Sequence, residues 1–185
     1  MDLKTAVAAR FREINGDHPM TEADDAYVSE WFRTLEQVCE GREETPDGLR
    51  ARMLAGELPL PGYLRSDGAE MVHPDYLALP GLLGEGLREL FVSSVGEDDW
   101  DLYLSGQFVC VRSVTPGTMM QKHLLVRRIE AQLERVEPDL VELGRAVGEL
   151  DALEPPFAPD YDVRRFGRAT SRTTLIEGVR AQYGV

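Results

Sequence analysis

The densest group of chemically versatile side chains in the sequence lies within the twelve residues 65–76. It combines a guanidinium, carboxylates, an imidazole and a phenol, in the order Arg65, Asp67, Glu70, His73, Asp75 and Tyr76. A base, an acid and an anion partner within reach of one pocket are the groups that general acid–base chemistry uses. We therefore predict a polar site here, with Asp67 or Asp75 as the base. The alternative is a solvated turn, in which Asp67 serves the turn and Asp75 acts as a cap.

A second candidate is the neighbouring pair Lys122 and His123. Lysine is rare in this chain, because 18 of its 20 basic residues are arginines. Helical spacing places Met119 and Lys122 on one face, so we expect Lys122 to point inward and to hold an anion, with Arg127 beside it. The alternative is a lysine whose stem lies along Met119 while its ammonium group reaches water.

Two windows without any acidic residue, 107–129 and 163–176, contain most of the basic residues of the C-terminal half. Within and just before the second window, Asp160 and Asp162 are followed by Arg164, Arg165 and Arg168. We predict that Arg165 and Arg168 contribute to an anion-binding surface. The alternative is an ion-pair network that ties the segment to the body of the protein.

The chain as a whole is acidic, which limits its partners. Its 185 residues include 20 basic and 33 acidic side chains, a formal net charge of −13. Residues 1–106 carry 9 basic and 22 acidic groups, whereas residues 107–185 carry equal numbers of both. Such a charge repels nucleic-acid phosphates and anionic membrane surfaces. We therefore expect neither a membrane nor a nucleic-acid partner.

Length and cysteine usage favour a cytoplasmic protein that folds without disulfides or a structural metal. A chain of 185 residues can bury a sizeable core without a metal or disulfides. Cys39 and Cys110 lie 71 positions apart in different predicted elements, so we expect reduced thiols. The sequence has no apolar run of about 18 residues and no signal-peptide pattern at its start.

The elements that must position these residues are mostly helices. Threonines at 21, 34, 45 and 115 and Ser171 stand where side chains cap a first turn. Apolar spacing predicts helices over residues 22–32, 34–40, 45–56, 82–91, 100–111, 116–136, 138–153 and 171–183. Residues 108–114 fit a buried strand equally well, and the proline-rich segment 154–167 is predicted to be a loop.

The expected fold class is mainly α, with a small β component (α+β). Residues 58–72 form two short extended runs around the turn Ser66-Asp67-Gly68, which predicts a hairpin. Helix, helix and hairpin in this order indicate a winged-helix-like head over residues 1–80, followed by a helical body over residues 81–185. Residues 34–64 resemble in their spacing the head of MerR-type winged helix-turn-helix regulators. The predicted recognition helix 45–56 is not strongly basic, which disfavours DNA reading.

Three longer segments resemble a known group of proteins. They are LPLPGYLRSDGAEMVHPDYLAL (58–79), YLSGQFVCVRSVTPGTMMQK (103–122) and LDALEPPFAPDYDVRRFGRATSRTTLI (150–176). These segments are similar to an actinobacterial family of small natural-product biosynthesis proteins of unassigned domain type. Within that family the chain resembles the aziridine-forming enzymes of the azinomycin pathway. These enzymes close a three-membered ring by expelling sulfate from an intermediate that is bound to an amino-group carrier protein.

The resemblance implies a lyase or cyclase that acts without a cofactor on a small-molecule or carrier-bound amino substrate. Displacement of sulfate by an amine needs a base, cations around the leaving group and a pocket that enforces in-line geometry. We expect Asp67 or Asp75 to be the base and His73 or Tyr76 to orient the amine. The expected anion-binding residues are Arg65, Lys122, His123, Arg127, Arg165 and Arg168.

Two other function classes remain open. One is a non-catalytic, winged-helix-like module that binds a carrier protein or a biosynthetic partner. The other is a ligand-responsive regulator, which the net charge of −13 disfavours. The histidines at 18, 73 and 123 have no metal-ligand spacing, and there is no glycine-rich phosphate loop. We therefore predict neither a metal nor a cofactor.

Overall fold

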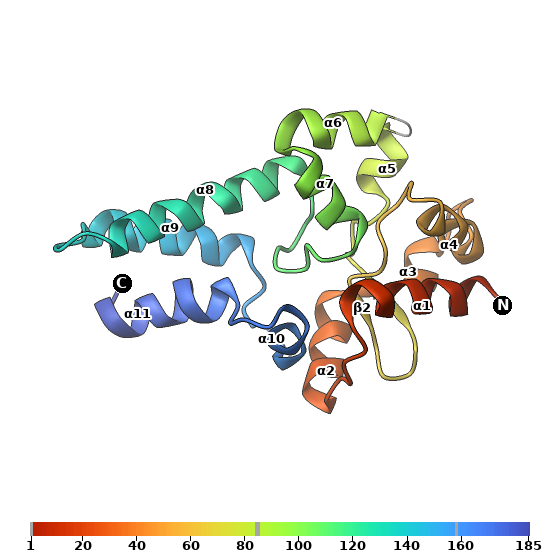
Figure 1. Ribbon diagram of the computed structural model, residues 1–185, viewed down its shortest axis with the longest axis horizontal. Coiled ribbons are helices and arrows are strands. Elements are labelled where there is room, and N and C mark those ends of the chain that lie inside the picture. The colour runs from red at the N-terminus through yellow and green to blue at the C-terminus, as the bar shows by residue number, and fades with distance from the viewer. Residues whose placement is uncertain (1, 84–85, 158) are drawn as a thin grey trace.

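The structure is a computed structural model that describes residues 2–83, 86–157 and 159–185, and most of them are helical (Figure 1). The N-terminal helices are α1 (Leu3–Asn15), α2 (Glu22–Trp31), α3 (Leu35–Cys39) and α4 (Pro46–Leu54). The strands are β1 (Arg33–Thr34), β2 (Tyr63–Leu64) and β3 (Glu70–Val72). The remaining helices are α5 (Ala78–Leu83), α6 (Gly86–Val95), α7 (Glu97–Leu104), α8 (Pro116–Leu133), α9 (Leu140–Leu153), α10 (Asp160–Phe166), the π-helical turn η1 (Arg172–Glu177) and α11 (Gly178–Tyr183). The expectation of a mainly α fold with a small β component is confirmed.

Most of the predicted helix starts are confirmed by side-chain caps. In each of them a threonine oxygen accepts a hydrogen bond from the amide three residues later, at Thr21, Thr34, Thr45 and Thr115. The prediction that Ser171 caps the last helix is wrong. Its hydroxyl donates to the carboxylate of Glu154 instead, and the turn that follows is π-helical.

The predicted hairpin is present as the antiparallel pair β2 and β3. Tyr63 lies opposite Met71 and Leu64 opposite Glu70. The sequence did not reveal β1, which pairs with the other edge of β3 and makes it the central strand. This central position places Glu70, Met71 and Val72 in the interior, and it directs the chain after Val72 towards the α7–α8 connection.

Aromatic side chains join the N-terminal helices to the C-terminal part of the chain. The fully buried ring of Tyr63 meets Phe32 edge-to-face at 4.9 Å and Tyr161 at 5.8 Å, between ring centroids. Val109 belongs to the same core. In Figure 1, α8, α9 and α11 form an elongated layer at one end, and α1–α4 with the sheet lie at the other. The division of the chain at residue 80 stays a prediction.

Two predicted elements are wrong. The helix over 100–111 ends at Leu104, because Gly106 has a φ of +69° and a Cβ there would lie 2.3 Å from the Pro61 oxygen. Residues 108–114 therefore form neither helix nor strand. The predicted loop 154–167 contains α10, which Pro159 opens and left-handed Gly167 ends. The helix predicted over 82–91 stays a prediction, because residues 84–85 lie outside the described ranges; the described residues of this segment belong to α5 and α6.

No helix within the described ranges is both long enough and apolar enough to cross a membrane.

Candidate functional site

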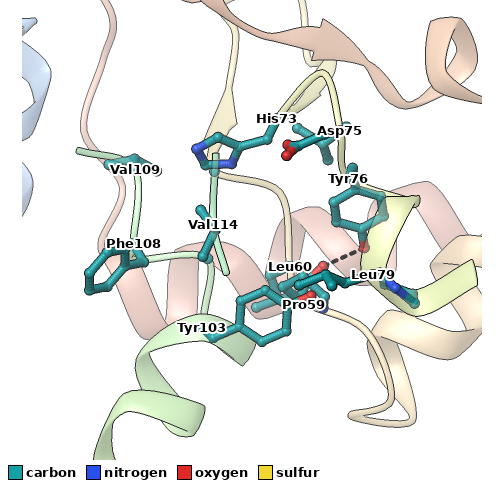
Figure 2. A pocket seen from close by; sticks show the side chains of 14 residues that line it. Pro59, Leu60, His73, Asp75, Tyr76, Leu79, Tyr103, Phe108, Val109 and Val114 are labelled. Atoms are coloured by element: carbon teal, nitrogen blue, oxygen red, sulfur yellow. Dashed lines mark hydrogen bonds between the residues drawn. The ribbon is translucent and has the colours of Figure 1, made fainter. Parts of the chain in front are cut away.

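A small cavity opens between the end of β3 and the segment that connects α7 to α8 (Figure 2). Its volume is about 40 Å³, room for roughly three waters or a short organic group. Most of its walls are apolar, and its polar side chains are an imidazole, a carboxylate and two phenols. The lining residues are Pro59, Leu60, Gly62, Val72, His73, Asp75, Tyr76, Leu79, Pro80, Tyr103, Gly106, Phe108, Val109 and Val114.

The imidazole of His73 is a hydrogen-bond acceptor in this cavity. Its Nε2 lies 3.0 Å from the Val111 carbonyl oxygen, which can only accept, so Nε2 carries the hydrogen and Nδ1 is the bare nitrogen. Burial lowers the pKa of His73, and this effect outweighs the raising influences of the hydrogen bond to Val111 and of the Asp75 charge. The ring also meets Phe32 at 4.8 Å between centroids. His73 is therefore neutral at pH 7 and able to take a proton.

Asp75 and Tyr103 supply the other available polar groups. The Asp75 carboxylate lies beside His73 in Figure 2 and accepts a hydrogen bond from the Ser113 hydroxyl. The Tyr103 ring stacks on Phe91 at 4.3 Å between centroids. Its hydroxyl forms no hydrogen bond with any residue in the described ranges, and burial raises its pKa, so it remains a donor. The cavity thus presents a neutral base, a carboxylate and a phenol.

Tyr76 lines the cavity as well, but its hydroxyl is engaged. It donates to the Pro59 carbonyl oxygen at 2.7 Å (dashed line in Figure 2). This bond holds the turn after β3 against the segment before β2. The geometry therefore gives Tyr76 a structural contact in place of the predicted contact with an amine.

Arg65 and Asp67 lie in the turn between β2 and β3, outside this cavity. The Arg65 guanidinium donates to both carboxylate oxygens of Asp67, at 3.0 and 2.7 Å, and to the Ser29 hydroxyl at 3.0 Å. The hydrogen bond from Arg65 lowers the pKa of Asp67 to about 2. A carboxylate that holds its proton so weakly is a poor base at neutral pH, so Asp67 is corrected from candidate base to ion-pair partner.

Lys122 points inward as predicted, with 7% of its surface exposed. Its Nζ donates to Glu154 Oε1 at 2.7 Å and to the Ser171 hydroxyl at 2.9 Å. Glu154 is itself 2% exposed. The ammonium charge is thus compensated by a buried carboxylate, and Lys122 does not line the cavity beside His73.

The remaining predicted anion-binding residues have separate surroundings. His123 Nδ1 lies 3.6 Å from an Asp99 carboxylate oxygen, and its ring meets Phe108. Arg127 is exposed on α8, with its Nε 3.5 Å from the His123 carbonyl oxygen. Arg168 is exposed after α10 and forms no ion pair with a residue in the described ranges. The turn with Arg65 lies far from α8 in Figure 1. The structure therefore does not gather Arg65, Lys122 and Arg127 around one anion.

Arg165 does not line the cavity, but its hydrogen bonds hold two of the lining segments together. Its guanidinium donates to the carbonyl oxygens of Gly62 at 2.6 Å and Gly106 at 2.8 Å, and to Asn15 Oδ1 at 2.7 Å. Burial lowers the pKa of Arg165, because only neutral oxygens accept from it. Gly62 and Gly106 both line the cavity. Arg165, which was predicted to bind an anion, therefore links two backbone segments of the cavity wall by hydrogen bonds.

Sequence reasoning missed Asp162, a buried carboxylate on α10. Its Oδ2 accepts from the Tyr63 hydroxyl at 3.1 Å, and its Oδ1 has no hydrogen-bond partner among the described residues. Burial raises its pKa to about 7. The alternating charges of 160–168 gave no sign that this acid, 99 positions from Tyr63, faces the interior. It does not line the cavity beside His73.

Within the described ranges, no group of three His, Cys, Asp or Glu side chains could hold a metal ion. The two cysteines, Cys39 and Cys110, are both free thiols.

Comparison with known proteins gives a match for the C-terminal half of the chain. No curated protein matches the chain, and no solved structure does either. Residues 87–184 match the model of a family of unknown function, DUF6058. The matched range includes Tyr103 and Phe108 on one wall of the cavity and begins after His73 and Asp75. With more than half of its residues covered by this match, the chain belongs to the family of unknown function DUF6058.

Proposed function

We propose that this protein is an enzyme of natural-product biosynthesis and that its substrate presents an amine to the cavity beside His73. The observation that carries the proposal is the pairing of a neutral imidazole with a carboxylate in one apolar cavity. His73 Nδ1 is free to accept a hydrogen bond and Asp75 already accepts one, and the lining residues that the structure describes include no lysine or arginine. Such a site favours an ammonium or amine group over an anion.

The reaction that we propose is closure of an aziridine ring with elimination of sulfate. The amine nitrogen attacks the neighbouring carbon and forms the new C–N bond. The C–O bond to sulfate breaks, and sulfate leaves with the electron pair. The proton from nitrogen passes to His73 Nδ1 or to Asp75, which supply the base that the step needs. The resemblance of residues 58–79, 103–122 and 150–176 to the biosynthetic family supports this choice of leaving group.

The same cavity also fits the alternative, a non-catalytic module that holds a carrier-bound amine without converting it. The observation in its favour is the lining, in which the described residues provide no cation for a departing sulfate. If the protein instead catalyses ring closure, sulfate has to leave through the open side of the cavity. An assay of sulfate release therefore separates the two functions.

The surrounding scaffold forms part of the proposal. We propose that α3, α4, β2 and β3 make a winged-helix-like head, since helix, helix and hairpin follow each other in that order. We also propose a cytoplasmic location, which the free thiols support. The expected partner is a small molecule or an amino-group carrier protein that delivers it.

Amine binding is tested with n-propylamine and the neutral n-propanol, monitored by the imidazole signals of the protein in NMR. The sequence contains three histidines, so each signal can be assigned by substitution. We expect n-propylamine to shift the His73 signal and n-propanol to bind at least tenfold more weakly. Asp75→Asn should weaken amine binding tenfold or more. Asp67→Asn is the matched control, the same change outside the cavity. Equal binding of amine and alcohol, or equal losses in both variants, would overturn the amine site.

Ring closure is tested with 2-aminoethyl hydrogen sulfate, the smallest substrate that contains both reacting groups. We expect sulfate release and aziridine formation above the rate in buffer, measured by ion chromatography and NMR. Release should decrease in His73→Gln, whose side-chain amide can still donate to the Val111 carbonyl, because Asp75 alone then remains as the base. Amine binding without sulfate release would reject ring closure and favour the binding module.

A further inference from the structure

A second, larger cavity lies between the end of α1, the turn after β2 and the start of α10. Its volume is about 310 Å³, within the roughly 300–1,000 Å³ range of small-molecule sites. The lining residues are Phe11, Arg12, Gly16, Asp17, His18, Pro19, Met20, Leu64, Arg65, Ser66, Gly68 and Tyr161. None of these residues lines the cavity beside His73.

Aromatic rings form the inner wall of this second cavity. Phe11 and Tyr161 are 1% and 2% exposed. The amide of Tyr161 donates to Asp24 Oδ1 at 3.1 Å, which fixes the start of α10 against α2. The His18 ring stands edge-to-face against Tyr161, at 6.2 Å between centroids. A flat apolar group can therefore lie in contact with fixed rings.

Hydrogen-bond donors line the same cavity and have no hydrogen-bond acceptor among the residues that the structure describes. The Tyr161 hydroxyl forms no hydrogen bond with any residue in the described ranges, although its ring is buried. Burial raises the pKa of Tyr161, so the hydroxyl keeps its proton. Arg12 Nε lies 3.2 Å from Asp17 Oδ1, and the Arg12 guanidinium forms no ion pair with another residue in the described part of the chain. A phenol and a guanidinium are thus available to an acceptor.

The two arginines of this lining are not equally available. Arg65 is paired with both carboxylate oxygens of Asp67, whereas Arg12 is half-exposed beside Asp17. His18 adds a further donor. It is placed by Gly16, which has a φ of +80° and where a Cβ would lie 2.6 Å from His18 Nε2. The chain bend that brings His18 to the cavity therefore requires glycine.

We propose that this cavity binds a small aromatic carboxylate. The carboxylate accepts hydrogen bonds from Arg12 and the Tyr161 hydroxyl, and the ring of the ligand packs against Phe11 and the body of Tyr161. A ligand of this class suits the combination of a flat apolar wall with the available donors of Arg12 and Tyr161. The site is separate from the cavity beside His73 and prefers the opposite charge, so the inference goes beyond the proposed function.

Benzoate is the probe for this site, and benzyl alcohol is its neutral counterpart. Both are titrated into the full chain, and the imidazole signals are followed by NMR. We expect benzoate to shift the His18 signal in a saturable manner and to leave the His73 signal in place. Benzyl alcohol should bind at least tenfold more weakly.

Substitutions then separate the site from a general charge effect. Arg12→Gln should weaken benzoate binding tenfold or more. Tyr161→Phe should weaken it several-fold. Arg10→Gln is the matched control, because Arg10 lies on the same helix, pairs with Glu13 at 2.6 Å and does not line the cavity. Equal affinity for benzoate and benzyl alcohol, or equal losses in Arg10→Gln and Arg12→Gln, would overturn the proposal. Because His18 and His73 report separately, failure here is distinguishable from failure of the amine site.

Discussion

Two buried carboxylates, Glu70 on the central strand β3 and Asp162 on α10, have very different surroundings. Glu70 is fully buried, and the Arg50 guanidinium donates to both of its oxygens; Arg50 also binds Glu36 and Asp47. Asp162 is 4% exposed and receives one hydrogen bond, from Tyr63. The N-terminal pair satisfies its charges completely, whereas the carboxylate on α10 lacks an ion-pair partner in the described chain. Buried charge therefore holds the first region together and makes the second sensitive to pH.

The largest effect is expected where the buried pair is complete. Arg50→Met removes the only cation that contacts Glu70 in the described ranges and leaves that carboxylate buried and unpaired. Loss of one partner of a buried pair costs about 3–5 kcal/mol of unfolding free energy. Urea unfolding of the variant measures this loss. Arg52→Met on the same helix is the control, because Arg52 is 40% exposed and its pair with Glu57 contributes at most about 1 kcal/mol. Similar losses in both variants would contradict the comparison.

Substitution of Lys122 tests whether its buried ion pair with Glu154 stabilises the C-terminal region as the Arg50–Glu70 pair stabilises the N-terminal region. Lys122→Met leaves Glu154 buried but still bonded to the Ser171 hydroxyl, so we expect a somewhat smaller loss, of about 2–3 kcal/mol. Adding Glu154→Gln removes the unpaired charge and should restore most of the stability. The double variant is compared with both single variants by urea unfolding. A double variant as unstable as Lys122→Met would show that the lost ion pair is not the cause.

The pH dependence of stability tests Asp162. Its pKa is about 7 in the folded protein, against about 3.9 for an exposed aspartate. The folded state therefore holds a proton that the unfolded state has released between pH 4 and pH 7. The stability from this group is fully present below pH 4 and is lost as the pH rises towards 7, by about 1.4 kcal/mol per pH unit. Asp162→Asn should remove this slope and make the protein more stable than the wild type at pH 8.

The pH profiles of wild type and Asp162→Asn are compared by urea unfolding at intervals from pH 5 to pH 8. Carboxylates with lowered pKa values, such as Asp24 and Asp151, contribute equally to both proteins and cancel in the difference. If the unfolding free energies of the two proteins depend on pH in the same way, Asp162 is ionised in the folded protein throughout this range. The proposed difference in pH sensitivity between Asp162 and Glu70 would then be rejected.

What the sequence could predict follows from how far apart the contacting residues are. Threonine caps, the hairpin turn and the helical face of Lys122 depend on residues three or four positions apart, and those predictions are confirmed. His73 and Asp75 could be grouped as neighbours because they are close in sequence, and both line the same cavity. The contact that fixes the His73 tautomer comes from Val111, 38 positions away. The helix expected over 100–111 failed because the close approach of Pro61 to Gly106 leaves no local pattern.

Long-range packing also decides which predicted charges are available. Asp67 looked like a base until its position beside Arg65 was known, and Arg165 looked like an anion ligand although the oxygens of Gly62 and Gly106 occupy it. Tyr103 and Asp162 had no local signal, because their importance depends on burial by distant segments. The sequence thus indicates which groups exist, and packing decides which of them remain unused.

The smallest expected effect concerns Tyr63, the residue that gives Asp162 its hydrogen bond. Tyr63→Phe keeps the ring against Phe32 and Tyr161 but removes the donor to Asp162 Oδ2. Loss of this bond should lower the unfolding free energy by about 1 kcal/mol at pH 8, where the carboxylate is ionised and needs the donor most. Because the bond favours the ionised form, its removal should raise the pKa of Asp162 further, so that the pH at which stability levels off moves upward. Urea unfolding from pH 5 to pH 9 shows both changes. A loss of equal size at every pH would mean that the Tyr63 hydroxyl stabilises the fold without acting on Asp162.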